Sequence, residues 1–182
     1  MVTTINSRDF IPVRIAVLTV SDSRTLGDDR SGDVLSQRLS DAGHHLADRQ
    51  ICLDSVIDIR QQITTWVDRP DIDVIITTGG TGFTGRDVTP EAIVPMFDKT
   101  MDGFSILFHH LSFQKIGTSA IQSRATAGLI ATPFVFVVPG SPGACKDAWD
   151  GILANQLDYR HLPCNFVEIF PRLDEHLKRT KS

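Results

Sequence analysis

Cysteine is scarce in this 182-residue chain, and no apolar run is long enough to span a bilayer. Its three cysteines, Cys52, Cys145 and Cys164, lie far apart, form no CxxC pair and leave one over if two are bridged. Residues 1–12 contain Arg8 and Asp9 and lack the apolar stretch of a signal peptide. We therefore expect a soluble, cytoplasmic protein with reduced thiols and no membrane partner.

Positive charge is also in short supply. The 18 lysines and arginines are outnumbered by 22 acidic residues, which gives a formal net charge of -4. A broad basic surface is the footprint of nucleic-acid binding, so we expect no nucleic-acid partner. The hydrophobic fraction of 41% is typical of a globular domain that buries its own core. The chain is thus predicted to form one domain over residues 1–182, with flexible tails at 1–12 and 171–182.

Strand-like and helix-like segments alternate along the chain. Apolar, β-branched runs predict strands over residues 13–21, 46–53, 72–77 and 134–138. Apolar spacing and turn residues predict helices over residues 32–42, 55–69, 104–113, 118–131 and 142–153, and another beginning at Thr89. Ser31, Thr89 and Ser141 are the expected N-caps. The alternation predicts an α/β three-layer sandwich with parallel core strands.

Three of the predicted strands end in small, polar or glycine-rich loops. These loops hold Ser21, Asp22 and Ser23 after the first strand, Gly79, Gly80, Thr81 and Gly82 after the third, and Gly140, Ser141 and Pro142 after strand 134–138. Parallel sheets bind ligands beyond the carboxyl ends of their strands. The loops therefore predict a binding site, although each alone also suits an ordinary turn between a strand and a helix.

The glycine loop fits neither common nucleotide motif. Gly80, Gly82 and Gly85 satisfy GxGxxG, but they follow the third strand and their helix begins only at Thr89. A nicotinamide-dependent oxidoreductase is therefore the weakest functional reading. The lysine and hydroxyl of a phosphate loop are also missing, because Arg86 follows Gly85. The loop can still bring bare backbone amides against phosphate or pterin oxygens.

Residues 77–92 resemble the signature of the MoaB/MogA family of molybdenum cofactor biosynthesis proteins, which is also found in the G domain of gephyrin. The resemblance extends over most of the chain, including residues 21–24, 31–33, 117–125 and 138–145. Three segments look more like the MoaB branch than like MogA: 121–124, 156–158 and 163–166. The resemblance implies a molybdopterin-binding fold, a mixed sheet with one antiparallel strand, and a homotrimer or a hexamer of two trimers.

The resemblance also implies a reaction. Members of this family transfer AMP from ATP to the terminal phosphate of molybdopterin and release pyrophosphate. Magnesium is expected on the triphosphate, held by carboxylates and phosphate oxygens more than by a dedicated protein site. A catalytically silent molybdopterin-binding or scaffold protein is the alternative, and other enzymes of the pathway are open as partners.

Two carboxylates are the candidate catalytic residues. The resemblance assigns a functional role to the counterpart of Asp87, which otherwise reads as a cap of the following helix. Asp54 follows the second strand, where the family usually has a proline before the acid and this chain has Leu53. Asp54 also reads as an N-cap for the helix at 55–69. The sequence does not identify the metal ligands.

The other candidate ligand contacts come from the same motifs, and they are Arg86, Thr89, Ser119, Ser123 and Arg124. On the predicted helix 118–131, Ser119 and Ser123 would share one face, and the planar guanidinium of Arg124 suits phosphate. A solvated helical face is the plain alternative. The pairs His44-His45 and His109-His110 do not predict a metal site, because adjacent side chains point apart and no matching cluster is present, so we expect surface or interface residues.

Overall fold

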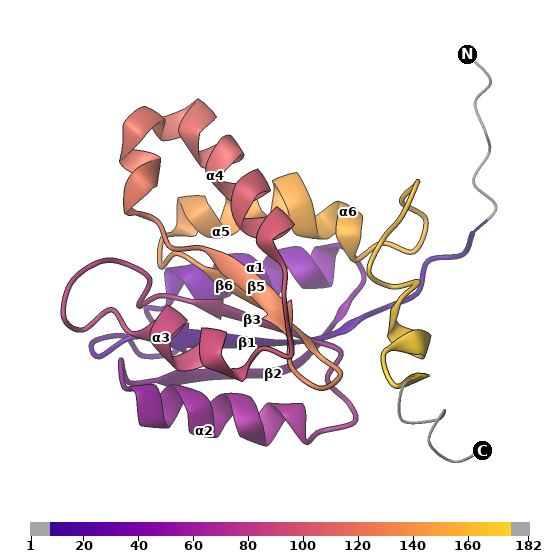
Figure 1. Cartoon of the computed structure of the whole chain (residues 1–182), viewed down its shortest axis with the longest axis horizontal. Helices are drawn as coiled ribbons and strands as arrows, with labels where there is room; N and C mark the ends of the chain where they lie inside the picture. The colour runs from indigo at the N-terminus through magenta and orange to yellow at the C-terminus, as the bar shows by residue number, and fades with distance from the viewer. Residues whose placement is uncertain (1–7, 176–182) are drawn as a thin grey trace.

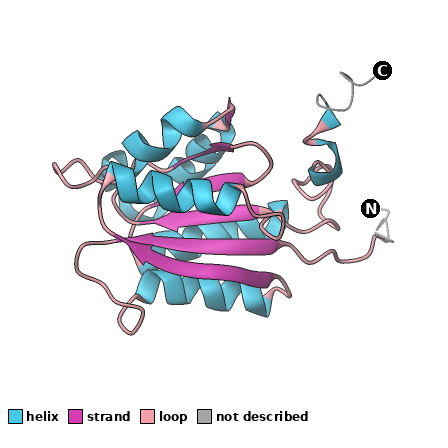
Figure 2. Ribbon diagram, turned by 90° about the horizontal axis from the view of Figure 1, so that it is seen from below, coloured by secondary structure: helices cyan, strands magenta, loops and turns pink. Residues whose placement is uncertain are grey.

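A six-stranded sheet lies between two layers of helices in the computed structural model, which describes residues 8–175 (Figures 1 and 2). The strand order is β2-β1-β3-β6-β5-β4. The strands are β1 (Arg14–Val20), β2 (His45–Cys52), β3 (Val74–Thr78), β4 (Lys99–Thr100), β5 (Thr126–Leu129) and β6 (Phe134–Val138). Within the described part of the chain, β5 alone runs in the direction opposite to the other strands. This confirms the α/β sandwich with a mixed, mostly parallel sheet.

The helices divide between the two faces of the sheet. The α-helices are α1 (Arg30–Asp41), α2 (Val56–Val67), α3 (Thr89–Ile93), α4 (Asp102–Ile116), α5 (Pro142–Ala148) and α6 (Ala154–Gln156). Shorter turns are η1 (Val94–Met96), η2 (Gly117–Gln122), the π-helical η3 (Trp149–Leu153) and η4 (Phe170–Arg172). The core cluster on one face takes side chains from α1, α4 and α5, and the cluster on the other takes them from α2 and α3.

Both faces of the central strands are covered, which explains their continuous apolar sequences. In β1, Ile15 and Val17 enter one core cluster, whereas Ala16 and Leu18 enter the other. All five residues of β6 are buried. The register then aligns the strand ends, because Thr19 pairs with Thr78 and Thr78 pairs with Val138. The loops after β1, β3 and β6 therefore leave the sheet at one edge.

The predicted helix over residues 118–131 is wrong. Gly117 ends α4 with a φ of 59°, and a 3-10 turn replaces the expected α-helix. The segment then becomes β5, which pairs with β6 on one side and β4 on the other. Position 128 in this strand requires glycine, because a Cβ there would lie 2.4 Å from the Phe97 ring. Pairing in the sheet therefore overrides the local helical pattern.

Two of the three predicted N-caps are also wrong. Asp29, and not Ser31, caps α1 by accepting a hydrogen bond of 2.9 Å from the Gly32 amide. Thr89 is the first residue of α3, and its hydroxyl turns to another partner in the glycine loop. Ser141 caps α5 as predicted, accepting from the Ala144 amide at 3.1 Å.

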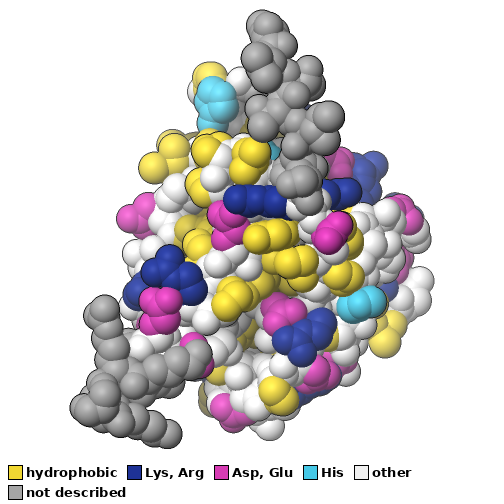
Figure 3. Space-filling model, turned by 90° about the vertical axis from the view of Figure 1, so that its right-hand side faces the viewer, with side chains coloured by type: hydrophobic (Ala, Val, Ile, Leu, Met, Phe, Trp, Pro, Cys, Tyr) yellow, Lys and Arg dark blue, Asp and Glu magenta, His cyan; other side chains and the backbone are white. Residues whose placement is uncertain are grey.

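The described ends of the chain contact the body at the edge opposite the glycine loop (Figure 1). Phe10 lies 5.2 Å from the His44 ring between centroids, and Phe170 lies 5.7 Å from Phe134. Residues 8–12 and 171–175 of the predicted tails are thus in the described structure, and the rest lie outside it. Figure 3 shows this end, where side chains of both charges are interspersed with hydrophobic ones. No helix within residues 8–175 is long and apolar enough to cross a membrane.

Candidate functional site

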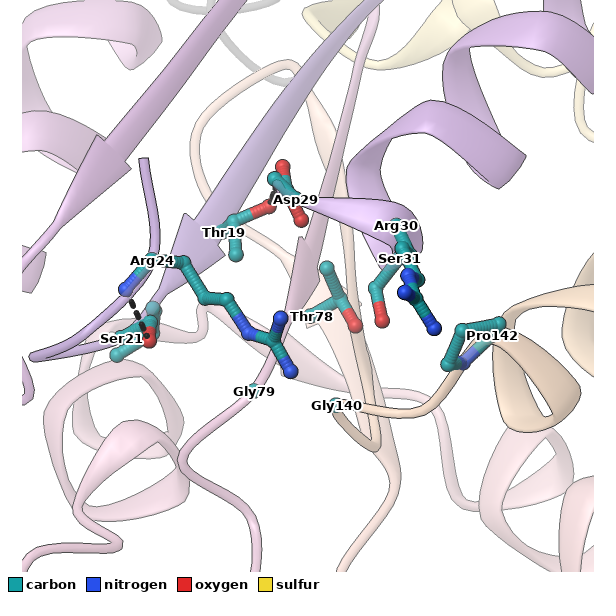
Figure 4. Close-up of a pocket in the computed structure, with 11 residues that line it drawn as sticks. Thr19, Ser21, Arg24, Asp29, Arg30, Ser31, Thr78, Gly79, Gly140 and Pro142 are labelled. Carbon is teal, nitrogen blue, oxygen red and sulfur yellow. Dashed lines mark hydrogen bonds between the residues drawn. The ribbon is translucent and has the colours of Figure 1, made fainter. Parts of the chain in front are cut away.

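A crevice opens between β1 and β3, because β2 and β3 are added to opposite sides of β1 in the sheet. After β1 the chain enters α1 on one face of the sheet and continues to β2, whereas after β3 it enters α3 on the other face. A cavity of about 190 Å³ lies at this point (Figure 4). Its lining residues are Thr19, Val20, Ser21, Arg24, Asp29, Arg30, Ser31, Thr78, Gly79, Gly140 and Pro142. The structure therefore brings together all three loops that the sequence predicts as a site.

Two glycines allow these loops to meet. Gly79 has a φ of 105°, and a Cβ there would lie 2.2 Å from the Val20 carbonyl oxygen. A Cβ on Gly140 would lie 2.9 Å from the Cα of Gly79. The Gly79 amide donates to the Val138 carbonyl at 3.2 Å. Any side chain at either glycine would push the floor of the cavity apart.

Two arginines that the sequence prediction omitted border the cavity. Arg24 reaches over Gly79, and Arg30 lies on the other side of the space, beside Pro142 (Figure 4). The Ser21 hydroxyl fixes the Arg24 backbone by accepting its amide hydrogen bond at 3.2 Å. A guanidinium group is a planar, permanently charged donor that suits phosphate oxygens. Arg24 lies within the resembling segment 21–24, and Arg30, the first residue of α1, directly precedes the segment 31–33, so this proximity was the available signal.

Asp29 forms the buried wall of the cavity. It is 1% exposed, and one carboxylate oxygen accepts from the Thr19 hydroxyl at 2.7 Å and from Arg49 Nη2 at 2.9 Å. The other oxygen caps α1 through Gly32. Both oxygens are thus satisfied by protein groups, and Asp29 orients Thr19 and the start of α1 without being open to a ligand.

Asp54 lies beside the glycine loop with an unsatisfied oxygen. Its Oδ1 is buried and has no hydrogen-bond partner within residues 8–175, and a Cβ on Gly80 would lie 2.4 Å from it. The alternative interpretation of Asp54 as an N-cap is wrong, because Ser55 caps α2. Burial raises the pKa of Asp54, as do the negative charges of Asp22 and Asp87, whereas Arg86 lowers it. A carboxylate oxygen in this state is a ready ligand for a cation.

Asp87 has a different environment. Its Oδ2 accepts from the Thr84 hydroxyl at 2.6 Å and from the Thr84 amide at 2.9 Å, and these bonds lower its pKa. It does not cap α3, whose N-cap Val88 has no side-chain bond. A Cβ on Gly82 would lie 2.8 Å from its carboxylate, so the loop folds tightly around Asp87. In this structure Asp87 closes the glycine loop.

The remaining predicted residues of this loop divide into buried anchors and exposed groups. Thr81 and Thr89 are buried, and the Thr89 hydroxyl donates to the Gly79 carbonyl at 2.9 Å. The Arg86 side chain is 82% exposed and lies 3.9 Å from Asp22. Asp22 in turn accepts from the Asp54 amide at 3.0 Å. The acids of two different loops are thus tied together at this edge.

The serines predicted on helix 118–131 do not share a helical face. Ser119 is exposed on η2, whereas Ser123 follows η2, and its hydroxyl accepts from the Ala125 amide at 3.3 Å. Arg124 turns back onto the glycine loop. Ser23 is exposed in the loop after β1. The structure does not bring Ser119 into the cavity at the switch point.

The residues within 8–175 do not form a ready-made metal site, because no three His, Cys, Asp or Glu side chains are grouped to hold an ion. Magnesium that is bound to a nucleotide needs fewer protein ligands, since one or two carboxylates and the phosphate oxygens suffice. The open oxygen of Asp54 fits that role. The predicted surface or interface position is wrong for His44, which is 5% exposed inside the domain and whose Nδ1 accepts from the Val13 amide at 3.1 Å.

Comparison with known proteins gives a consistent result. A family model described as "probable molybdopterin binding domain" matches residues 16–159. Molybdenum cofactor biosynthesis protein B of Escherichia coli K12 is 48% identical over 160 residues, which cover 88% of this chain and 94% of the relative. The corresponding protein of Bacillus subtilis is 42% identical over 146 residues, which are 80% of this chain and 86% of that one.

Solved structures of similar proteins share the architecture. A crystal structure of molybdenum cofactor biosynthesis protein B has a TM-score of 0.78 and 35% identity, covering 94% of this chain and 99% of that one. The tungsten cofactor synthesizing protein MoaB from Pyrococcus furiosus has a TM-score of 0.72 and 35% identity, covering 79% of this chain and 92% of its own. The similarity therefore extends over nearly the whole length of these proteins.

Proposed function

The chain belongs to the MoaB/MogA family of molybdenum cofactor biosynthesis proteins, on its MoaB branch, and from that membership we propose that it adenylylates molybdopterin with magnesium ATP. Its role in molybdenum cofactor biosynthesis follows from the family. The observation that supports catalysis beyond binding is the buried Oδ1 of Asp54. This oxygen has no partner within residues 8–175 and lies beside the glycine loop.

In the proposed reaction an oxygen of the terminal phosphate of molybdopterin attacks the α-phosphorus of ATP. A new phosphorus–oxygen bond forms to the pterin phosphate, the bond from the α-phosphorus to its bridging oxygen breaks, and pyrophosphate leaves. Such a transfer needs positioning and charge neutralisation more than covalent help from the protein. Nothing is oxidised or reduced.

We assign the terminal phosphate of molybdopterin to the cavity between Arg24 and Arg30. Two guanidinium groups from opposite walls neutralise its charge, and the glycine floor lets the phosphate approach the backbone. Asp54 lies beside Gly80 and does not line this cavity, and there it would ligate magnesium held mainly by the triphosphate. Magnesium bound there would neutralise charge that develops on the leaving pyrophosphate.

Two alternatives remain for comparison. A molybdopterin-binding scaffold would use the same cavity but leave Asp54 without a catalytic task. A nicotinamide-dependent oxidoreductase finds less support, because the GxGxxG glycines lie in the loop after β3, and α3 begins nine residues after Gly80 and has only five residues. Dinucleotide folds of that class begin their helix directly at the motif.

Pyrophosphate release separates the first two functions. Purified protein is incubated with molybdopterin, ATP and magnesium. An added pyrophosphatase converts the released pyrophosphate to phosphate, which is measured. We expect release with the wild type and a loss of about a hundredfold or more in D54N. D71N serves as the matched control, since it neutralises an exposed carboxylate paired with Arg69. Tight molybdopterin binding without release would leave the scaffold function.

We also propose that the protein self-associates as a trimer or as a hexamer of two trimers. Helix α4 and turn η2 project from the body in Figure 1. Several large apolar side chains on them are exposed: Ile106, Leu107, Phe113, Ile116 and Ile121. An apolar surface of this kind marks protein–protein contact. Sedimentation equilibrium should give three or six copies, and a monomer at all concentrations would refute this proposal.

A further inference from the structure

Arg124 contacts both ends of the glycine loop. It lies in the link between η2 and β5, far from the loop in sequence. Its Nε donates to the Thr81 carbonyl at 3.1 Å, and its Nη2 donates to the Asp87 carbonyl at 2.9 Å. Its Nη1 forms an ion pair with Glu91 in the first turn of α3. One side chain thus joins the start of the loop, its end and the helix that follows.

The guanidinium group is largely committed by these contacts. Its carbon also lies 5.2 Å from the centre of the Phe83 ring, so an aromatic side chain covers one face. All three of its nitrogens already donate to protein acceptors. A free arginine that awaits a phosphate would have its outer donors open. Arg24 is less committed, because its Nη1 alone has a protein acceptor among residues 8–175, the Asp28 carbonyl at 3.2 Å, and it borders the cavity together with Arg30.

The loop has a second set of bonds inside it. The Asp87 carboxylate holds the amide and hydroxyl of Thr84, and the Asp87 amide donates to the Thr84 carbonyl at 3.0 Å. These inner bonds span three residues only. They shape the turn at the tip, but they cannot fix the loop relative to the sheet, whereas Arg124 contacts residues at both ends of it.

We propose that Arg124 is a positioning residue, a latch that holds loop 81–87 against the sheet and thereby keeps the Asp87 carboxylate in place within this loop. The structural part of this proposal is independent of any reaction. Its consequence for turnover rests on the proposed adenylylation. The latch replaces the phosphate contact that the sequence suggested for this arginine.

The direct test is amide hydrogen exchange in the ligand-free protein, read from peptides that cover residues 81–89. We expect R124A to speed exchange there by about tenfold or more, because two charge-assisted hydrogen bonds to the backbone are lost. Peptides from β1 and β6 should be unchanged. R38A is the matched control, since Arg38 forms a bidentate ion pair with Asp150 that also joins segments distant in the sequence.

Two further variants separate the contacts. R124K keeps a charge but cannot reach two carbonyls and Glu91 together, so exchange should stay fast. E91Q removes only the ion-pair partner and should change exchange by less than about threefold. Exchange over residues 81–89 as slow in R124A as in the wild type would overturn the latch, and so would full restoration by lysine.

Kinetics then link the latch to function. If the protein adenylylates molybdopterin, R124A should lower kcat about tenfold with KM for both substrates within about threefold. A raised KM with unchanged kcat and unchanged exchange would show a phosphate ligand instead. Faster exchange in R124A together with an inactive wild type would refute the proposed function while leaving the latch in place.

Discussion

Replacing Gly80 by alanine should damage both stability and activity. Gly80 has a φ of 60°, and a Cβ there would lie 2.3 Å from the Thr89 hydroxyl and 2.4 Å from Asp54 Oδ1. The left-handed conformation costs alanine about 1 kcal/mol. Displacing the buried Thr89 hydroxyl from the Gly79 carbonyl costs about 1–3 kcal/mol more. We therefore expect a loss of roughly 2–4 kcal/mol, or roughly 5–15 °C in Tm.

Gly85 provides the control in the same loop. It has no atom within 4 Å of a Cβ and no positive φ, so G85A should keep the wild-type Tm within about 2 °C. Both variants are compared by thermal denaturation with circular dichroism and by pyrophosphate release. G80A should also lose most turnover, because Asp54 must move. Equal stability and activity in the two variants would refute the packing of Asp54 and Thr89 against Gly80.

Two further predictions concern titratable groups. The folded-state pKa of Asp54 is raised above its ordinary 3.8, so its stabilising contribution is present below that pH and is lost as the pH rises through the folded value. D54N should therefore melt about 1–3 °C higher at pH 7 and show no gain at pH 3.5, while an equal gain at both would be inconsistent with a raised pKa. Burial lowers the pKa of His44 to about 4, so stability present above its ordinary 6.5 is lost as the pH falls toward 4. Urea denaturation should show about 1–2 kcal/mol of this loss, allowing for solvent screening, and H44Q, which can still accept from Val13, should remove it.

The central strands could be predicted because their residues carry the signal themselves. β1 and β6 are buried on both faces and consist almost entirely of apolar, β-branched or aromatic residues. β5 was missed because its four residues, TAGL, carry no such pattern. It is a strand only because β6 and β4 supply partners on both sides.

The site was predictable where it depends on strand ends. Once the strands were known, Ser21, Gly79 and Gly140 had to emerge at one edge, and they do. The roles of residues that depend on their side-chain partners could not be predicted from the sequence. Nothing in the local sequence shows that the Thr89 hydroxyl donates to the Gly79 carbonyl or that Arg124 donates to carbonyls of the glycine loop.

Transfer of label from ATP tests the central claim most directly. The protein is incubated with molybdopterin, magnesium and ATP labelled at the α-phosphate, and the pterin fraction is separated and counted. Adenylylation predicts that label moves to the pterin with one pyrophosphate released for each product, and that D54N abolishes the transfer. Label that stays in ATP, in a preparation that binds molybdopterin, would contradict the account.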